Sequence, residues 1–141
     1  MRKIFISSDH AGFKLKETIK DYLKNKKIKF EDLGPKDDRN VDYPDYAHKV
    51  ARKVKSSKSN IGVLVCGSGT GMNIAANKHK NIRAAQCFNL KSTKLSRLHN
   101  DANIITLGSR LVTKKNALKF VSVFLNTKFE GGRHSRRVKK I

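Results

Sequence analysis

The chain has 141 residues and a hydrophobic fraction of 38%, which suits one soluble globular domain that folds without disulfides or a structural metal. Its two cysteines, Cys66 and Cys87, form no Cys-x-x-Cys pair, and no histidine cluster has zinc-ligand spacing, so we expect no disulfide scaffold and no metal. No segment resembles a signal peptide or reaches the roughly 20 apolar residues of a membrane span, so we expect a cytoplasmic protein with no membrane partner.

The net charge of +21 is the most unusual global property of the chain. Such a charge can indicate nucleic-acid binding through phosphate neutralisation. The lysines are, however, scattered over nearly every predicted helix, without the interleaved aromatic side chains that stack on bases. The pattern therefore favours a solvated, lysine-rich surface that attracts acidic small molecules and has no nucleic-acid partner. A basic nucleic-acid-binding module is the alternative from another functional class.

The first half of the chain is predicted to alternate strands and helices. Residues 3–8 are rich in Ile and Phe and indicate a strand with Asp9 and His10 at its carboxyl end. In the helix that follows, apolar residues recur at the helical period, at Leu15, Ile19, Tyr22 and Leu23. Residues 29–33 predict a second strand. A second helix begins near Pro44 and has an apolar stripe at Ala47, Val50, Ala51 and Val54.

The second half continues the same alternation. Residues 61–66 are apolar and predict a third strand that ends at Cys66. A glycine-rich loop follows, and the next helix is expected over residues 72–78. The remaining predicted elements are a strand at 83–87, a helix at 91–98, a strand at 103–107 and a helix at 114–126, with a basic tail from about residue 130.

Alternating strands and helices indicate βαβ units, and hence an α/β fold. We expect a single three-layer α/β/α domain over residues 1–141, with a Rossmann-like parallel sheet of about five strands and helices on both faces. Ligands bind outside the carboxyl ends of the strands in such sheets. This rule predicts that Asp9, His10, Cys66 and Arg110 lie together at one edge.

Cys66 and the loop after it are the central candidate site. Backbone N–H groups of a glycine-rich loop before a helix favour an anion or a developing oxyanion, and donors of this kind favour a reactive thiolate. Cys66 is therefore a candidate base or nucleophile. A cysteine hydrolase, with His10 or His99 paired to the thiol, stays open, and so does an ordinary turn beside a buried cysteine.

Two arginines in the tail point to a phosphorylated substrate. Arg133 and Arg137 are four residues apart, so in a helix they share one face and can hold one phosphate; a solvated basic terminus is the alternative. A phosphorylated substrate, a base and oxyanion donors together suggest proton transfer beside a carbonyl through an enediolate, without metal or organic cofactor. We interpret His48, His79 and His134 as surface residues and Cys87 as a packing residue.

Seven motifs, in order, closely resemble ribose-5-phosphate isomerase type B over essentially the whole chain. They are Ser8-Asp9-His10-Ala11-Gly12, Asp42-Tyr43-Pro44-Asp45-Tyr46-Ala47, Cys66-Gly67-Ser68-Gly69-Thr70-Gly71, Ala75-Ala76-Asn77-Lys78, Arg97-Leu98-His99-Asn100-Asp101, Gly108-Ser109-Arg110 and Glu130-Gly131-Gly132-Arg133-His134. The resemblance implies an isomerase that interconverts ribose 5-phosphate and ribulose 5-phosphate in the pentose phosphate pathway. Isomerases of the same fold that act on allose 6-phosphate or galactose 6-phosphate are the close alternative.

The resemblance also implies roles for individual residues. Cys66 would be the base, His99 would open the sugar ring, and Ser68 and Asp9 would assist them. The implied substrate-binding residues are Asp9, His10, Tyr43, Gly67, Ser68, Gly69, Thr70, Gly71, Asn100, Arg110, Arg133 and Arg137, with no cofactor and no metal. A second branch of the family has a glutamate base where this chain has Met72, which favours Cys66. The family forms homodimers, some of which pair into tetramers, and their active sites take residues from both chains.

Overall fold

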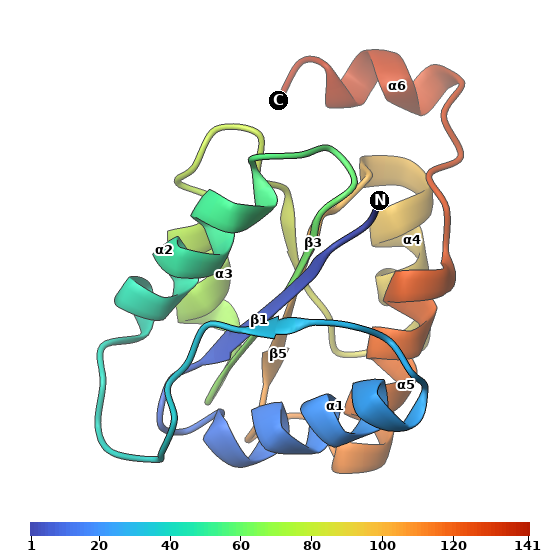
Figure 1. Cartoon of the computed structure of the whole chain (residues 1–141). Coiled ribbons are helices and arrows are strands. Elements are labelled where there is room, and N and C mark those ends of the chain that lie inside the picture. The colour runs from blue at the N-terminus through green and yellow to red at the C-terminus, as the bar shows by residue number, and fades with distance from the viewer.

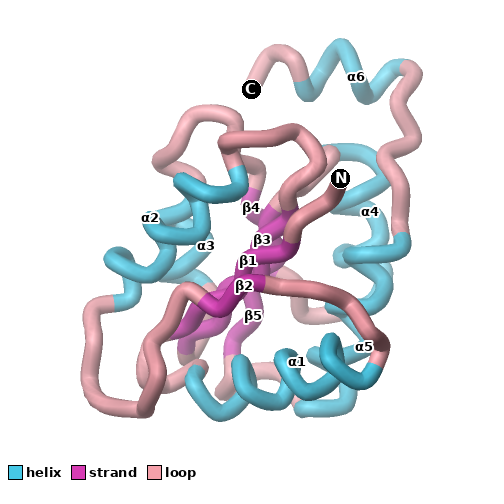
Figure 2. Tube along the Cα trace, in the orientation of Figure 1, coloured by secondary structure: helices cyan, strands magenta, loops and turns pink.

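Five parallel strands form one sheet in the order β2-β1-β3-β5-β4 in the computed structural model, which describes all 141 residues. The strands are β1 (Ile4–Ser8), β2 (Glu31–Asp32), β3 (Ile61–Cys66), β4 (Ala84–Gln86) and β5 (Ile104–Gly108). The three central strands β1, β3 and β5 are buried along their whole length. This burial on both faces explains why these strands contain runs of consecutive apolar residues, such as Ile4-Phe5-Ile6 in β1, rather than an alternating pattern. Figure 2 shows the strands stacked through the middle of the molecule.

Helices cover both faces of this sheet, as predicted (Figure 1). One face packs against α1 (Phe13–Asn25), α4 (Leu90–Asn100) and α5 (Lys114–Asn126), and the other against α2 (Tyr43–Val54) and α3 (Thr70–Ala76). Each face has its own hydrophobic core, of 17 buried residues on the α1 and α5 side and 12 on the α2 and α3 side. The three-layer α/β/α architecture is confirmed.

Most predicted elements are present, and the differences lie at their ends. The helix at Lys114–Asn126 has the predicted bounds, because the Thr113 hydroxyl caps it by accepting from the Asn116 N–H at 3.1 Å. The predicted strand at residues 29–33 is only the two residues of β2, which is an edge strand with a single neighbour. The helix predicted at residues 91–98 extends to Asn100 and ends where Asp101 adopts a left-handed conformation.

The basic tail is ordered as a short helix. Residues Arg133–Val138 form α6, which extends beyond the end of α4 at the periphery of the molecule (Figure 1). Arg133 and Arg137 therefore lie one helical turn apart, as the spacing predicted for a helical tail. None of the six helices combines the length and the apolar character that crossing a membrane requires.

Candidate active site

A pocket of about 390 Å³ lies at the edge of the sheet where β1, β3 and β5 end. The strands end together because Ser8 pairs with Val65, and Cys66 pairs with Gly108. Eight of the predicted site residues line this pocket: Asp9, His10, Tyr43, Cys66, Gly67, Ser68, Gly71 and Arg110. The expectation that residues after the carboxyl ends of parallel strands lie together therefore predicted the positions of these side chains correctly.

Cys66 lies at the base of the pocket, 4% exposed. Its Sγ accepts a hydrogen bond from the Gly69 N–H at 3.1 Å, and Gly69 can turn its amide this way because it adopts a φ of 79°. The N–H groups of Gly67, Ser68 and Gly71 donate to no group of the chain. The loop thus holds a thiol beside several free backbone donors, an arrangement that can stabilise negative charge on a bound oxygen.

Asp9 and His10 are fixed by the backbone around them. Asp9 Oδ1 accepts from the Gly12 N–H at 2.9 Å, and His10 Nδ1 accepts from the Val41 N–H at 3.3 Å. A neutral His10 that accepts at Nδ1 carries its proton on Nε2 and can donate with it. Gly12 is required here, because a Cβ at that position would lie 2.3 Å from the Val65 carbonyl oxygen.

Arg110 and Tyr43 form the sides of the pocket. The Arg110 guanidinium lies against Gly67, where an added Cβ would be 2.6 Å from its Nη1 atom, and it pairs with no carboxylate of the chain. The Tyr43 ring lies over Gly71 in the same way, because a Cβ added to Gly71 would be 2.5 Å from the Cε1 atom of that ring. The pocket therefore combines a free guanidinium, which can bind an anion, with an aromatic wall.

Gln86 is a residue of this region that sequence reasoning missed. Its Nε2 donates to the Ser68 carbonyl oxygen at 2.8 Å and to Thr70 Oγ1 at 2.9 Å, and so ties β4 to the glycine-rich loop. Thr70 and Gly69 belong to the loop but do not line the pocket. A lone glutamine in a short edge strand gives no sequence signal for this contact.

The remaining predicted residues lie at the opposite edge of the sheet. His99, Asn100 and Arg137 line a second pocket of about 420 Å³ between the last turn of α4 and α6. This turn precedes β5, whereas Cys66 is level with the end of β5, and the five residues Ile104–Gly108 span roughly 13 Å. Figure 1 shows α6 and the last turn of α4 near the chain's N-terminus, away from the end of β3. One chain therefore does not bring His99 to Cys66. Arg133, the first residue of α6, lines neither pocket.

His134 was predicted at the surface, and that prediction is wrong. Its side chain is only 5% exposed, and its ring stacks on that of His99 with centroids 4.2 Å apart and planes 13° apart. Burial lowers the pKa of His134, and the positive charges of His99 and Arg133 lower that pKa further, against an opposing effect of Glu130. Helix α6 is too short for a hydrophobic period to reveal which of its residues is buried.

The other residues left outside the predicted site are partly or fully buried. His48 Nδ1 and His79 Nε2 are 2.7 Å apart and share a hydrogen bond between α2 and the loop after α3, so neither is a fully solvated residue. Cys87 is 1% exposed in the core beside α5, and burial raises the pKa of its thiol. Cys87 is thus a packing residue, as predicted.

The comparison with known proteins agrees with this geometry. The model of the Ribose/Galactose Isomerase family matches residues 4–141. The chain belongs to the ribose/galactose isomerase family. It is 42% identical over 141 residues to ribose-5-phosphate isomerase B of Escherichia coli, covering 100% of this chain and 95% of that protein.

Two solved structures of family members share the fold. Ribose-5-phosphate isomerase B of Clostridium thermocellum superposes with a TM-score of 0.95 at 48% identity, covering 98% of this chain and 93% of that one. The Mycoplasma genitalium enzyme, solved with bound ribulose 5-phosphate, gives a TM-score of 0.94 at 48% identity, covering 99% and 93%. The match includes the glycine-rich loop, α4 and α6, so the Cys66 pocket and the His99 pocket both lie within the shared fold.

Proposed function

We propose that this protein is a ribose-5-phosphate isomerase that interconverts D-ribose 5-phosphate and D-ribulose 5-phosphate through an enediolate. The observation that carries the proposal is the buried Cys66 thiol at the end of β3, beside backbone donors that have no partner in the chain. The E. coli relative is named for this reaction, and the M. genitalium relative holds ribulose 5-phosphate.

Cys66 is the base in the proposed reaction. Its thiolate removes the proton from C2 of the open-chain aldose, and the electron pair of that C–H bond forms the enediolate double bond as charge moves onto the carbonyl oxygen. The N–H groups of Gly67, Ser68 and Gly71 stabilise the enediolate oxygens, with the Ser68 hydroxyl beside them. The thiol then returns the proton to C1 while the proton of the C2 hydroxyl passes to the C1 oxygen, which gives the C2 ketone and the C1 hydroxyl of the ketose without net redox change or any cofactor. Asp9 and His10 bind the sugar hydroxyls at the pocket wall.

A second copy of the chain completes the site in this proposal. His99 opens the furanose ring, and Asn100 contacts the sugar, yet both lie at the opposite edge of the sheet from Cys66. In a two-fold symmetric dimer, the α4 and α6 edge of one copy can face the pocket of the other. Arg133 and Arg137 of α6 then hold the phosphate, together with Arg110. Pairing of two such dimers into a tetramer is compatible with this arrangement.

An isomerase of a six-carbon sugar phosphate is the alternative within the family, whose model covers both ribose and galactose isomerases. The ribulose 5-phosphate in the M. genitalium relative, at 48% identity, favours the five-carbon substrate. We also propose the cytoplasm as the compartment, supported by two cysteines that are both free thiols.

The proposal is tested by assaying purified protein on ribose 5-phosphate, allose 6-phosphate and galactose 6-phosphate in the presence of EDTA. We expect the highest kcat/KM on ribose 5-phosphate, and a loss of at least ~100-fold in kcat for Cys66→Ala, the usual scale for removing a general base. Cys87→Ala is the matched control, since it removes the other buried thiol and leaves the pocket intact. Full activity of Cys66→Ala would refute the mechanism, and equal turnover of galactose 6-phosphate would refute the substrate.

A further inference from the structure

His99, Glu130 and His134 form a group of metal-ligand type that the proposed isomerisation does not require. One ligand atom from each residue lies within 4.8 Å of the other two, and Glu130 Oε2 is 3.8 Å from His99 Nε2. Two imidazoles and a carboxylate are the donor set that Zn²⁺ and neighbouring divalent transition metals take in proteins. We propose that these three residues bind such an ion, and that the bound ion inhibits the enzyme by occupying His99.

The backbone holds the three residues together before any ion binds. The Glu130 N–H donates to the carbonyl oxygen of Leu98 at 3.0 Å, which fixes the segment after α5 to the last turn of α4, next to His99. The His134 N–H donates to Gly131 O at 3.1 Å as α6 begins. Binding therefore needs side-chain movement only. Because the ligand atoms lie at most 4.8 Å apart, an ion at their centre would be no more than about 2.8 Å from each of them, against a bond of about 2.1 Å, so the inward shift is at most roughly 0.7 Å, in addition to a rotation of the His99 ring.

His134 provides an independent sign that a partner is missing. Its Nε2 atom is buried and has no hydrogen-bond partner, and an unpaired buried polar atom normally costs free energy. His99 provides the required mobility, because 38% of its side chain is exposed. The two rings are nearly parallel, so their lone pairs do not converge, and His99 has to turn out of the stack when an ion binds.

The surroundings indicate inhibition rather than a structural role. Three protein ligands leave a fourth position open, and the pocket of about 420 Å³ lined by His99, Asn100 and His134 lies beside it. Arg137 lines the same pocket, and its positive charge weakens cation binding. We therefore expect micromolar rather than tighter affinity. An ion bound through His99 removes the imidazole that the proposed function assigns to ring opening.

The test uses Co²⁺ as a spectroscopic probe on the metal-free full-length protein. We expect one Co²⁺ per chain, with the visible absorption bands of four-coordinate Co²⁺, and displacement of Co²⁺ by Zn²⁺. Glu130→Gln and His134→Gln should each weaken Co²⁺ binding at least ~10-fold. Glu31→Gln is the matched control, because its carboxylate is 54% exposed against 55% for Glu130, and it should bind Co²⁺ like the unchanged protein.

Cys66 is the main rival ligand, since thiolates bind the same metals. A thiolate-to-cobalt charge-transfer band, or Co²⁺ binding lost in Cys66→Ala and kept in Glu130→Gln, would overturn the proposal. So would the absence of Co²⁺ binding at millimolar concentration. In activity assays, Zn²⁺ should inhibit reversibly with EDTA, and Glu130→Gln should need at least ~10-fold more Zn²⁺ for the same inhibition. The Co²⁺ spectra do not depend on turnover, so failure of the proposed isomerase activity would leave this inference separately testable.

Discussion

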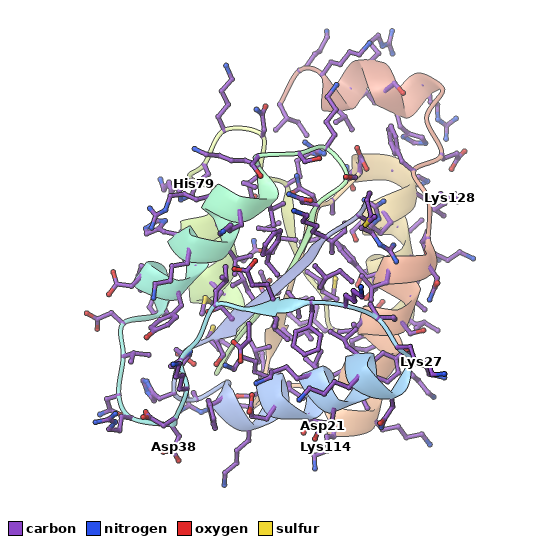
Figure 3. All side chains as sticks on the ribbon, viewed as in Figure 1. Asp21, Lys27, Asp38, His79, Lys114 and Lys128 are labelled. Carbon is purple, nitrogen blue, oxygen red and sulfur yellow. The ribbon has the colours of Figure 1, made fainter.

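His79 links the stability of the fold to pH through a single residue. It lies beside α2 (Figure 3), where burial lowers its pKa below 6.5 and the positive charges of His48, Lys55 and Arg52 lower that pKa further. The folded state thus binds this proton less readily than the unfolded chain does. The stability that comes from keeping His79 neutral is fully present above about pH 6.5. It is lost as the pH falls from this ordinary pKa through the lower pKa of His79 in the folded state.

We therefore expect the free energy of unfolding in urea to fall as the pH is lowered below about 6.5, and to fall less in His79→Gln than in the unchanged protein. The Gln variant removes the titrating group and keeps a side chain that can hydrogen-bond His48. His134 has a pKa lowered in the same direction, so some acid sensitivity remains in the variant. Identical pH dependence in the two proteins would contradict the assignment to His79.

A buried lysine joins α1, β2 and the segment that leads to the pocket. Lys16 Nζ is fully buried, donates to both carboxylate oxygens of Asp32 at 2.9 and 3.1 Å, and donates to the Pro35 carbonyl oxygen at 2.6 Å. Burial raises the pKa of Asp32, but hydrogen bonds from Lys20, Lys16 and the Gly34 N–H outweigh it, so the pKa lies below its ordinary value. The segment held in this way continues to Val41 and Tyr43 at the pocket.

Lys16→Met should cost about 2 kcal/mol of unfolding free energy, because it leaves the Pro35 oxygen without its donor and Asp32 with one fewer. It should also raise the KM for ribose 5-phosphate, since the segment that carries Tyr43 loosens. Lys20→Met is the control on the same carboxylate: Lys20 pairs with Asp32 at 2.7 Å but does not hold Pro35, so we expect a smaller loss, of about 1 kcal/mol, and an unchanged KM. Equal losses in the two variants would show that the Pro35 contact contributes nothing.

The order of elements was predictable, and so was the pocket around Cys66. Residues that follow a parallel strand lie at its carboxyl edge, which correctly grouped Asp9, Cys66 and Arg110. The same rule places residues that precede a strand at the opposite edge, and His99 precedes β5. Residues that the sequence analysis assigned to one site therefore lie in two separate pockets of the structure. The burial of His134 had no signal, because it depends on contact between α4 and a six-residue helix.

Charge is distributed unevenly along the whole molecule. Nine of the 11 acidic residues precede residue 46, so the rest of the chain has only Asp101 and Glu130 to balance its lysines and arginines. Figure 3 shows charged side chains such as Lys114 and Lys128 at the periphery. We expect this field to concentrate an anionic substrate, so the KM for ribose 5-phosphate should rise several-fold from about 0.01 to about 0.15 M ionic strength, as screening increases. The kcat should stay constant. A KM independent of salt would show that the long-range field of the molecule does not concentrate the substrate.

The assembly determines whether the Cys66 pocket of one chain meets the His99 pocket of another. Cys66→Ala and His99→Asn each disable one of these two pockets, and in a symmetric dimer both variants alone should be inactive. Co-expression of the two variants with different affinity tags allows purification of mixed dimers. Such a dimer has one site with both defects and one site with intact Cys66 and His99, so we expect roughly half of the activity of the unchanged dimer. Activity no higher than that of either parent, in dimers shown to contain both chains, would mean that each chain forms its site without the other.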